Sequence, residues 1–245
     1  MMDQLALMLF THDPELANKA EEAGIDRIVV DFEFRGKKER QSGYHLEVNK
    51  ATIDDLRRIR KAVRIPVIAR INPISPESGE EIRAVISEGA DIVMLPMFRR
   101  TREVEDFLEL TADAVGTNLL FETKDSVDIA PALAMLKFDE YYIGLNDMAI
   151  DYNLSFAYDV LRYEMVSSIR RALGGRPFGF GGITVVGGGS PLKTTEILEK
   201  MARYGCSLAI LRRAFKRDVQ GRVMSEEVVK IKRTYMGLLN EVLPG

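Results

Sequence analysis

Short apolar runs alternate with amphipathic helical patterns along this chain, and this alternation limits the possible folds more than any other feature of the sequence. We predict strands over residues 5–10, 27–34, 66–71, 92–97, 118–123, 141–146, 177–183 and 207–212. Helices are predicted after them, over residues 13–24, 53–63, 79–88, 102–115, 126–136, 156–173, 192–204 and 225–242. Strands that are apolar throughout are covered on both faces. Eight strand–helix units in 245 residues therefore predict a single (β/α)8 TIM barrel over residues 1–245, with a doubly wound open sheet as the alternative.

Charge and cysteine content narrow the function classes. The formal net charge of −3 gives no general attraction to nucleic acid or to an anionic membrane. Cys206 is the single cysteine, which excludes an intrachain disulfide and a zinc site of several thiolates, and we interpret it as a buried structural thiol. The first residues contain Asp3 and only a short apolar run, so we expect no signal peptide, no membrane span and a cytoplasmic location.

Polar side chains stand where several of the predicted strands end. In barrels of this kind the chemistry lies at the carboxyl ends of the strands. A charge that points into the barrel there without a partner costs roughly several kcal/mol, so its presence needs a reason. The residues in question are Thr11 and His12, Asp31 and Glu33, Arg70 and Asn72, Glu122, and Asn146 with Asp147.

Glu122 and Asp147 end neighbouring strands of the predicted barrel, which lie about 4.8 Å apart. Two carboxylates at that separation repel each other unless a cation or a proton lies between them. Two carboxylates, water and substrate oxygens are the usual ligands of Mg²⁺ or Mn²⁺. We therefore interpret the pair as metal ligands; the alternative is that both residues are helix N-caps.

Arg70 ends the predicted third strand, between PVIA and INP. A guanidinium that faces the mouth of a barrel suits a carboxylate or a developing enolate oxygen. The alternative, which does not exclude the first, is that Arg70 balances the charge of Glu33 or Asp31. We expect Arg70 to be catalytic.

An ordered set of motifs resembles one family. DFE at 31–33, ARIN at 69–72, GADIVMLPM at 89–97, FET at 121–123 and IGLNDMA at 143–149 follow one another in the order typical of the HpcH/HpaI aldolase and citrate lyase β-subunit family, within the phosphoenolpyruvate/pyruvate-type barrels. The similarity extends from residue 5 to residue 152 and fades beyond it. No single motif is specific; the ordered set is.

The resemblance implies a metal-dependent carbon–carbon lyase, or class II aldolase, that acts on a 2-oxo acid such as pyruvate. Its metal ligands correspond to Glu122 and Asp147, and its enolate-stabilising arginine corresponds to Arg70. Backbone N–H groups after Gly144 would hold the substrate carboxylate. The resemblance also implies a homo-oligomer, a trimer or a hexamer, in which the last helix packs on a neighbouring protomer.

The sequence departs from this family at the positions that move protons. The pyruvate aldolases have a histidine after the strand-two glutamate, where this chain has Phe34, and its aspartate partner corresponds to Ser87. In the citrate-lyase-like branch, an acidic residue stands at the position that corresponds to Phe34, and a lysine stands at the position that corresponds to Met97. His12 at the end of the first strand is the remaining candidate base, although a lone histidine there is more often structural.

Three basic runs follow strands of the predicted barrel, over residues 35–40, 98–102 and 212–217. Such runs are often only solvated surface. Three of them at one end of an acidic protein suggest a substrate with a phosphate, a CoA tail or a sugar acid. The glycine-rich run 185–190 is either a phosphate-binding loop or a mobile connection. Our candidate substrate-binding residues are Glu33, Asn72, Gly144, Asn146, Arg99 and Arg100.

Three functions remain open at this point. The first is a Mg²⁺- or Mn²⁺-dependent aldolase with an anionic co-substrate. The second is an acyl-CoA lyase or hydrolase of the citrate-lyase-like branch, which the basic runs favour and Met97 does not. The third is a barrel that binds an anionic metabolite without catalysis.

Overall fold

The computed structural model describes residues 5–35 and 51–242 and contains eight parallel strands. They are β1 (Ala6–Phe10), β2 (Arg27–Asp31), β3 (Val67–Arg70), β4 (Ile92–Leu95), β5 (Gly116–Phe121), β6 (Glu140–Ile143), β7 (Phe178–Phe180) and β8 (Leu208–Leu211). Neighbours pair in chain order, and β8 pairs with β1. Between β7 and β8 the backbone N–H of Ser207 donates to the carbonyl of Phe178 at 2.8 Å. The sheet therefore closes into a ring, and the predicted (β/α)8 barrel is confirmed.

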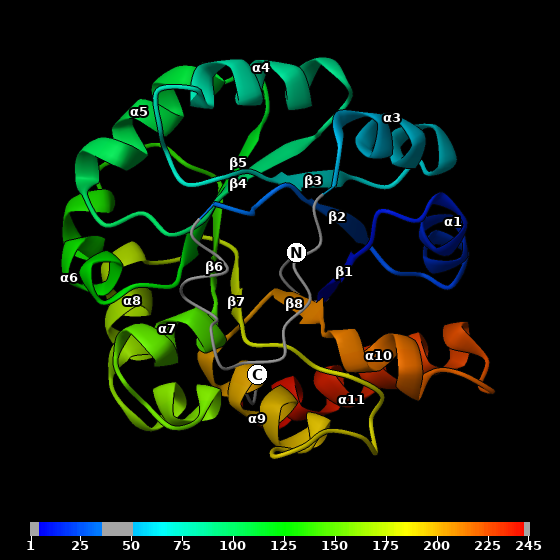
Figure 1. The fold of residues 1–245 in the computed structure, drawn as a ribbon. Coiled ribbons are helices and arrows are strands. Elements are labelled where there is room, and N and C mark those ends of the chain that lie inside the picture. Colours follow the sequence, from blue (N-terminus) through cyan, green and yellow to red (C-terminus); the bar gives the residue numbers. More distant parts are fainter. Residues whose placement is uncertain (1–4, 36–50, 243–245) are drawn as a thin grey trace.

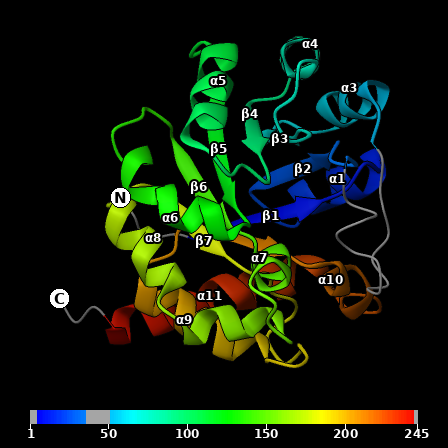
Figure 2. The same cartoon turned by 60° about the vertical axis from the view of Figure 1, so that its left-hand side comes forward.

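Helices surround this ring on all sides, as Figure 1 shows. They are α1 (Pro14–Glu22), α3 (Ile53–Ala62), α4 (Ser78–Ser87), α5 (Thr101–Thr111), α6 (Lys124–Leu133), α7 (Leu145–Asp151), the 3-10 helix η1 (Ala157–Arg162), α8 (Met165–Leu173), α9 (Thr194–Tyr204), α10 (Arg213–Asp218) and α11 (Met224–Val242). In Figures 1 and 2, α9 and α11 lie side by side on one flank. No helix in the described part of the chain has the length and apolarity needed to cross a membrane.

Several predicted boundaries differ from those of the structure. The sixth strand ends at Ile143 because Gly144 is the N-cap of α7, so Asn146 and Asp147 belong to a helix and not to a strand. The helix predicted over residues 156–173 is divided into η1 and α8. The basic run at 212–217, predicted as a loop, forms the short helix α10.

Strand alternation divides the apolar residues into two layers. The side chains of one parity pack between the strands and the helices and form the larger core. The side chains of the other parity fill the barrel itself with an apolar layer, which consists of Met8, Val29, Ile68, Met94, Leu120, Tyr142 and Leu208. This layer separates the amino-terminal end of the barrel from its carboxyl-terminal end.

A buried ion pair fills the barrel below the apolar layer. Nη1 of Arg27, the first residue of β2, donates to both carboxylate oxygens of Glu140 at 2.7 Å. Glu140 begins β6 and also accepts a hydrogen bond of 2.8 Å from the Asn118 side chain of β5. Because the partners come from opposite sides of the ring, this cluster ties the strands together at the end remote from the cavity described below.

The seam between β7 and β8 depends on Tyr142 of the apolar layer. Its hydroxyl accepts a hydrogen bond from the backbone N–H of Ile210 at 2.8 Å and donates one to the carbonyl of Gly181 at 2.9 Å. Gly179 permits the close approach, because a Cβ there would lie 1.9 Å from the carbonyl oxygen of Leu208. One side chain thus completes the closure of the ring from within.

Candidate functional site

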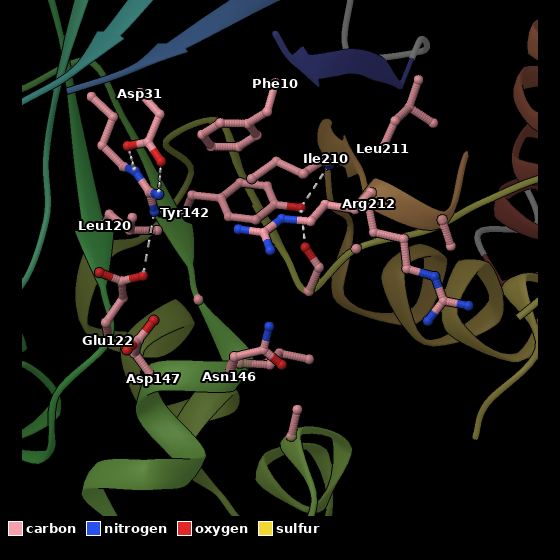
Figure 3. Close-up of a pocket in the computed structure, with 18 of the residues that line it drawn as sticks. Phe10, Asp31, Leu120, Glu122, Tyr142, Asn146, Asp147, Ile210, Leu211 and Arg212 are labelled. Carbon is pink, nitrogen blue, oxygen red and sulfur yellow. Dashed lines mark hydrogen bonds and ion pairs between the residues drawn. The ribbon is translucent and has the colours of Figure 1, made fainter. Parts of the chain in front are cut away.

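A cavity of about 470 Å³ lies above the apolar layer, at the carboxyl ends of the strands (Figure 3). Its floor is formed by four side chains that point into the barrel, which are Phe10, Leu120, Tyr142 and Ile210. The next inward position of each strand lies two residues further on. These positions are occupied by His12, Asp31, Arg70, Glu122, Gly144 and Arg212, and all of them line the cavity.

Arg70 of β3 is held on two sides by carboxylates. Its Nε and Nη2 donate to the two carboxylate oxygens of Asp31 at 2.9 and 2.7 Å. Nη2 lies 3.4 Å from Oε2 of Glu33, and Nη1 lies 4.0 Å from Oε1 of Glu122. Asp31 therefore fixes the plane of the guanidinium and directs its Nη1 edge toward Glu122. Both expected roles of Arg70 are compatible with this geometry, because it balances charge and lines the cavity.

The charge of Arg70 is secured by this environment. Burial alone lowers the pKa of a guanidinium, but the charges of Asp31, Glu33 and Glu122 outweigh burial and raise the pKa of Arg70 above its ordinary value. Arg70 therefore remains a cation at every pH at which the protein is folded. A permanently charged and oriented donor of this kind suits an oxyanion.

Glu122 and Asp147 come together at one side of the cavity, as Figure 3 shows. Glu122 directly follows β5 and is only 3% exposed, while Asp147 lies in the first turn of α7. Neither is a helix N-cap, because Thr123 caps α6 and Gly144 caps α7. The alternative interpretation of the pair as two N-caps is therefore wrong.

Gly144 makes room for the Glu122 carboxylate. A Cβ at position 144 would lie 2.6 Å from Oε1 of Glu122 and 2.7 Å from its Cγ, so the Glu122 side chain would have to move to accommodate it. The turn from β6 into α7 thus needs a residue without a side chain at this point. Gly144 lines the cavity, and its lack of a side chain leaves room for the Glu122 carboxylate.

The donor set at this corner suits a hard cation with few protein ligands. Within residues 5–35 and 51–242, no group of three or more His, Cys, Asp and Glu side chains is arranged to hold a metal ion. A metal ion between Glu122 and Asp147 would have two protein carboxylates and would take its other ligands from water and substrate. Mg²⁺ is commonly bound in this way, through one or two carboxylates.

The remaining predicted site residues divide into two groups. His12 and Asn146 are exposed and line the cavity. Glu33 does not line it but contacts Arg70. Asn72 does not line it either; its side-chain oxygen accepts hydrogen bonds from the backbone of Phe34 and Arg35 at 3.0 and 3.1 Å. The structure thus places Asn72 as a support for the chain that follows β2.

No residue of the basic run at 98–102 lines the cavity. Nη1 of Arg99 binds Asp125 at 2.7 Å and its Nη2 binds Asp151 at 2.6 Å, which raises the pKa of Arg99 and lowers the pKa of the partly buried Asp151. Arg100 is exposed. Neither arginine lines the cavity, and Arg99 links the start of α5 to α6 and α7. Of the run at 35–40, residues 36–40 lie outside the described residues.

The positions at which the chain departs from the resembling family are also placed. Phe34 is partly exposed, and Met97 is buried. Ser87 ends α4, where its hydroxyl donates to the carbonyl of Ala84 and does not line the cavity. Of the glycine-rich run 185–190, only Ser190 lines the cavity.

Sequence reasoning missed Arg212 and Tyr158 as individual site residues. Arg212 follows β8, two positions after the inward-facing Ile210, and Tyr158 lies in η1; both line the cavity. The signal for Arg212 was present in the sequence. In Arg212, as in Arg70 and Glu122, a charged residue stands two positions after an inward-facing apolar residue of the same strand.

Comparison with known proteins does not assign this chain to a family. No protein-family model matches it. No curated protein matches it either. The fold and the cavity define a class of protein: a (β/α)8 barrel whose cavity is lined by carboxylates and arginines. The cavity lies at the carboxyl ends of the strands, where the active sites of such barrels are found. Since this fold carries many unrelated activities, function has to be argued from the side chains of the cavity.

Proposed function

We propose that this protein is a metal-dependent carbon–carbon lyase, an aldolase that acts on a 2-oxo acid through a stabilised enolate. One observation carries the proposal: the oriented guanidinium of Arg70 and the carboxylates of Glu122 and Asp147 line the same cavity. The motifs that contain these residues resemble those of the HpcH/HpaI aldolases, which favours the same function.

The metal assignment rests on the chemistry of the donor set. Glu122 and Asp147 would hold Mg²⁺ or Mn²⁺, and both offer the hard oxygen ligands that these ions prefer. A bound divalent cation supplies Lewis-acid polarisation of the substrate oxygens. Asp31 and Glu33 both contact Arg70, so they help to hold the guanidinium beside the metal site.

Arg70 has the donor that an enolate oxygen needs. Its Nε and Nη2 are engaged by Asp31, while Nη1 faces Glu122 across 4.0 Å. An oxyanion that approaches Nη1 from the cavity would gain a charge-assisted hydrogen bond. Because the guanidinium is already fixed, little reorganisation is needed when negative charge develops on the substrate oxygen.

The proton that the reaction moves requires a further group. Among the residues that line the cavity, His12 is the candidate base, since it is exposed just after β1 and a histidine is the side chain that most often transfers protons in enzymes. Tyr142 is unsuited to this role, because burial raises the pKa of its hydroxyl well above the ordinary value. We propose His12 as the base on this ground.

Pyruvate methyl exchange tests the proposal directly. Purified protein with Mg²⁺ or Mn²⁺ in deuterated water should replace the methyl protons of pyruvate with deuterium, as followed by proton NMR. Arg70→Ala and Glu122→Gln should abolish the exchange, and Arg203→Gln, on the exposed face of α9, should leave it unchanged. Absence of exchange with every 2-oxo acid, despite bound Mn²⁺, would exclude the aldolase and leave the acyl-CoA lyase or hydrolase and the non-catalytic anion-binding barrel.

A further inference from the structure

Arg212 reaches into the cavity from the side opposite the carboxylates. It follows β8, and Figure 3 shows its side chain extended into the cavity, with Glu122 and Asp147 together on the other side. Gly182 allows this path, because a Cβ there would lie 3.1 Å from Cβ of Arg212. The cavity therefore has a cationic side chain on its β8 wall as well as the cluster around Arg70.

Arg212 differs from Arg70 and Arg99 in having no carboxylate at ion-pair distance among the described residues. Arg70 and Arg99 each have a carboxylate oxygen within 2.7 Å, whereas no carboxylate of the described chain lies within 4.0 Å of the Arg212 guanidinium. Its hydrogen bonds come from Nη1, which donates to Tyr158 Oη at 3.2 Å and to the carbonyl of Ser190 at 3.3 Å. Its Nε is buried and has no hydrogen-bond partner among the described residues.

Tyr158 orients this guanidinium without neutralising it. Its hydroxyl accepts from Arg212 and donates to the carbonyl of Gly182 at 3.3 Å. Burial raises the pKa of Tyr158 despite the opposing effect of Arg212, so the hydroxyl stays protonated and uncharged. A partly buried cation held in this way is stabilised most by an anion that enters the cavity, because a charge-assisted hydrogen bond then meets the donors that the protein leaves open.

We propose that Arg212 binds an anionic oxygen group, a carboxylate or a phosphate, at the end of the substrate remote from Arg70. The inference rests on the proposed function for the identity of the first end, and it adds that the substrate has charged groups at both ends. The cavity of about 470 Å³ falls in the range of roughly 300–1,000 Å³ that is usual for small-molecule sites, so it holds more than a three-carbon 2-oxo acid. Arg213 and Lys216 line the same cavity.

Titration with inorganic phosphate and with succinate tests the assignment without the natural substrate. The readouts are the ¹⁵N–¹H signal of Arg212 Nε, identified by its loss in Arg212→Lys, and the dissociation constant from calorimetry. At least one probe should bind saturably and shift this signal, and Arg212→Gln should weaken its binding by about tenfold or more. Stronger binding of phosphate identifies a phosphorylated substrate, and stronger binding of succinate a dicarboxylic one.

Matched variants separate the possible failures. Arg217→Gln removes the same charge from the same run, but Arg217 is 76% exposed at its side chain and paired with Asp218, so anion affinity should be unchanged. Tyr158→Phe keeps the cation and should weaken binding about two- to tenfold. Glu122→Gln should abolish pyruvate exchange and retain anion binding, so this inference and the proposed function fail separately. Equal affinity in wild type and Arg212→Gln, or saturable binding of neither probe, would overturn the inference.

Discussion

Asp31 and Arg70 form a two-point ion pair in which both carboxylate oxygens accept from one guanidinium, at 2.9 and 2.7 Å. The pair lies at the carboxyl ends of the adjacent strands β2 and β3, where the two residues are in register. Both side chains are nearly buried. The fork geometry, and not charge alone, thus sets the direction in which Arg70 faces the cavity.

Arg70→Lys should therefore be nearly as damaging as removal of the side chain. A lysine keeps the charge but cannot make the two-point contact, so its donor is no longer directed at the substrate oxygen. We expect pyruvate exchange to fall by about 10²–10³-fold, the usual effect of losing one oxyanion donor. Arg57→Lys breaks an equivalent two-point pair with Glu88 outside the cavity and should leave exchange unchanged.

Gly144→Ala should displace the Glu122 carboxylate, because the added Cβ would lie 2.6 Å from Oε1. We expect Mn²⁺ affinity, measured by electron paramagnetic resonance, to fall by roughly 10–100-fold, as for other changes that disturb the orientation of a ligand. Gly187→Ala is the matched control, since a Cβ at Gly187 meets no atom within 4 Å. Unaltered Mn²⁺ binding in Gly144→Ala would remove Glu122 from the metal site.

Strand alternation explains which parts of the site were predictable. Arg70 and Glu122 interrupt apolar strands at an inward position, and that signal is local in the sequence. Arg212 obeys the same rule but stands at the head of a basic run, where it resembles surface charge. Arg99 is predicted to bind substrate from its place in a basic run, because its partner Asp151 lies 52 residues away and only the fold brings the two together.

The limits of the fold prediction have the same origin. The eight strands were predictable because each is apolar on both faces, but the end of β6 was not, since the capping role of Gly144 depends on the position of Glu122. Asn72 lies two residues beyond the end of β3, and its side-chain oxygen contacts the backbone of residues 34 and 35. The homo-oligomeric assembly and the cytoplasmic location stay predictions.

Tyr142→Phe should loosen the closure of the barrel. The change leaves the N–H of Ile210 and the carbonyl of Gly181 without the hydroxyl that joins them. We expect the free energy of unfolding in urea to fall by about 1–3 kcal/mol, the cost of buried polar groups that lose their partner. Tyr163→Phe, at a side chain that is 53% exposed, should have no measurable effect on the same urea transition.

Cys206 should be inert in the folded protein. It is buried, and burial raises the pKa of its thiol well above the ordinary value, so the reactive thiolate is suppressed. Labelling with a thiol reagent such as DTNB should proceed at the rate of unfolding and become rapid in urea. Because the folded pKa is above the unfolded one, the contribution of Cys206 to stability declines as the pH rises past about 8.5. Rapid labelling without urea would contradict the burial of this thiol.

The apolar layer across the barrel gives the interior two compartments that can be altered separately. Arg27, Asn118 and Glu140 occupy the lower one, and the layer that contains Met94 and Tyr142 stands between them and the cavity. Substitutions in the lower compartment act on the strength of the scaffold, and those in the upper compartment act on ligand choice. Thermal stability could therefore be raised by substitutions around Arg27 and Glu140, and substrate range could be changed by substitutions that line the cavity, with little effect of one set on the other.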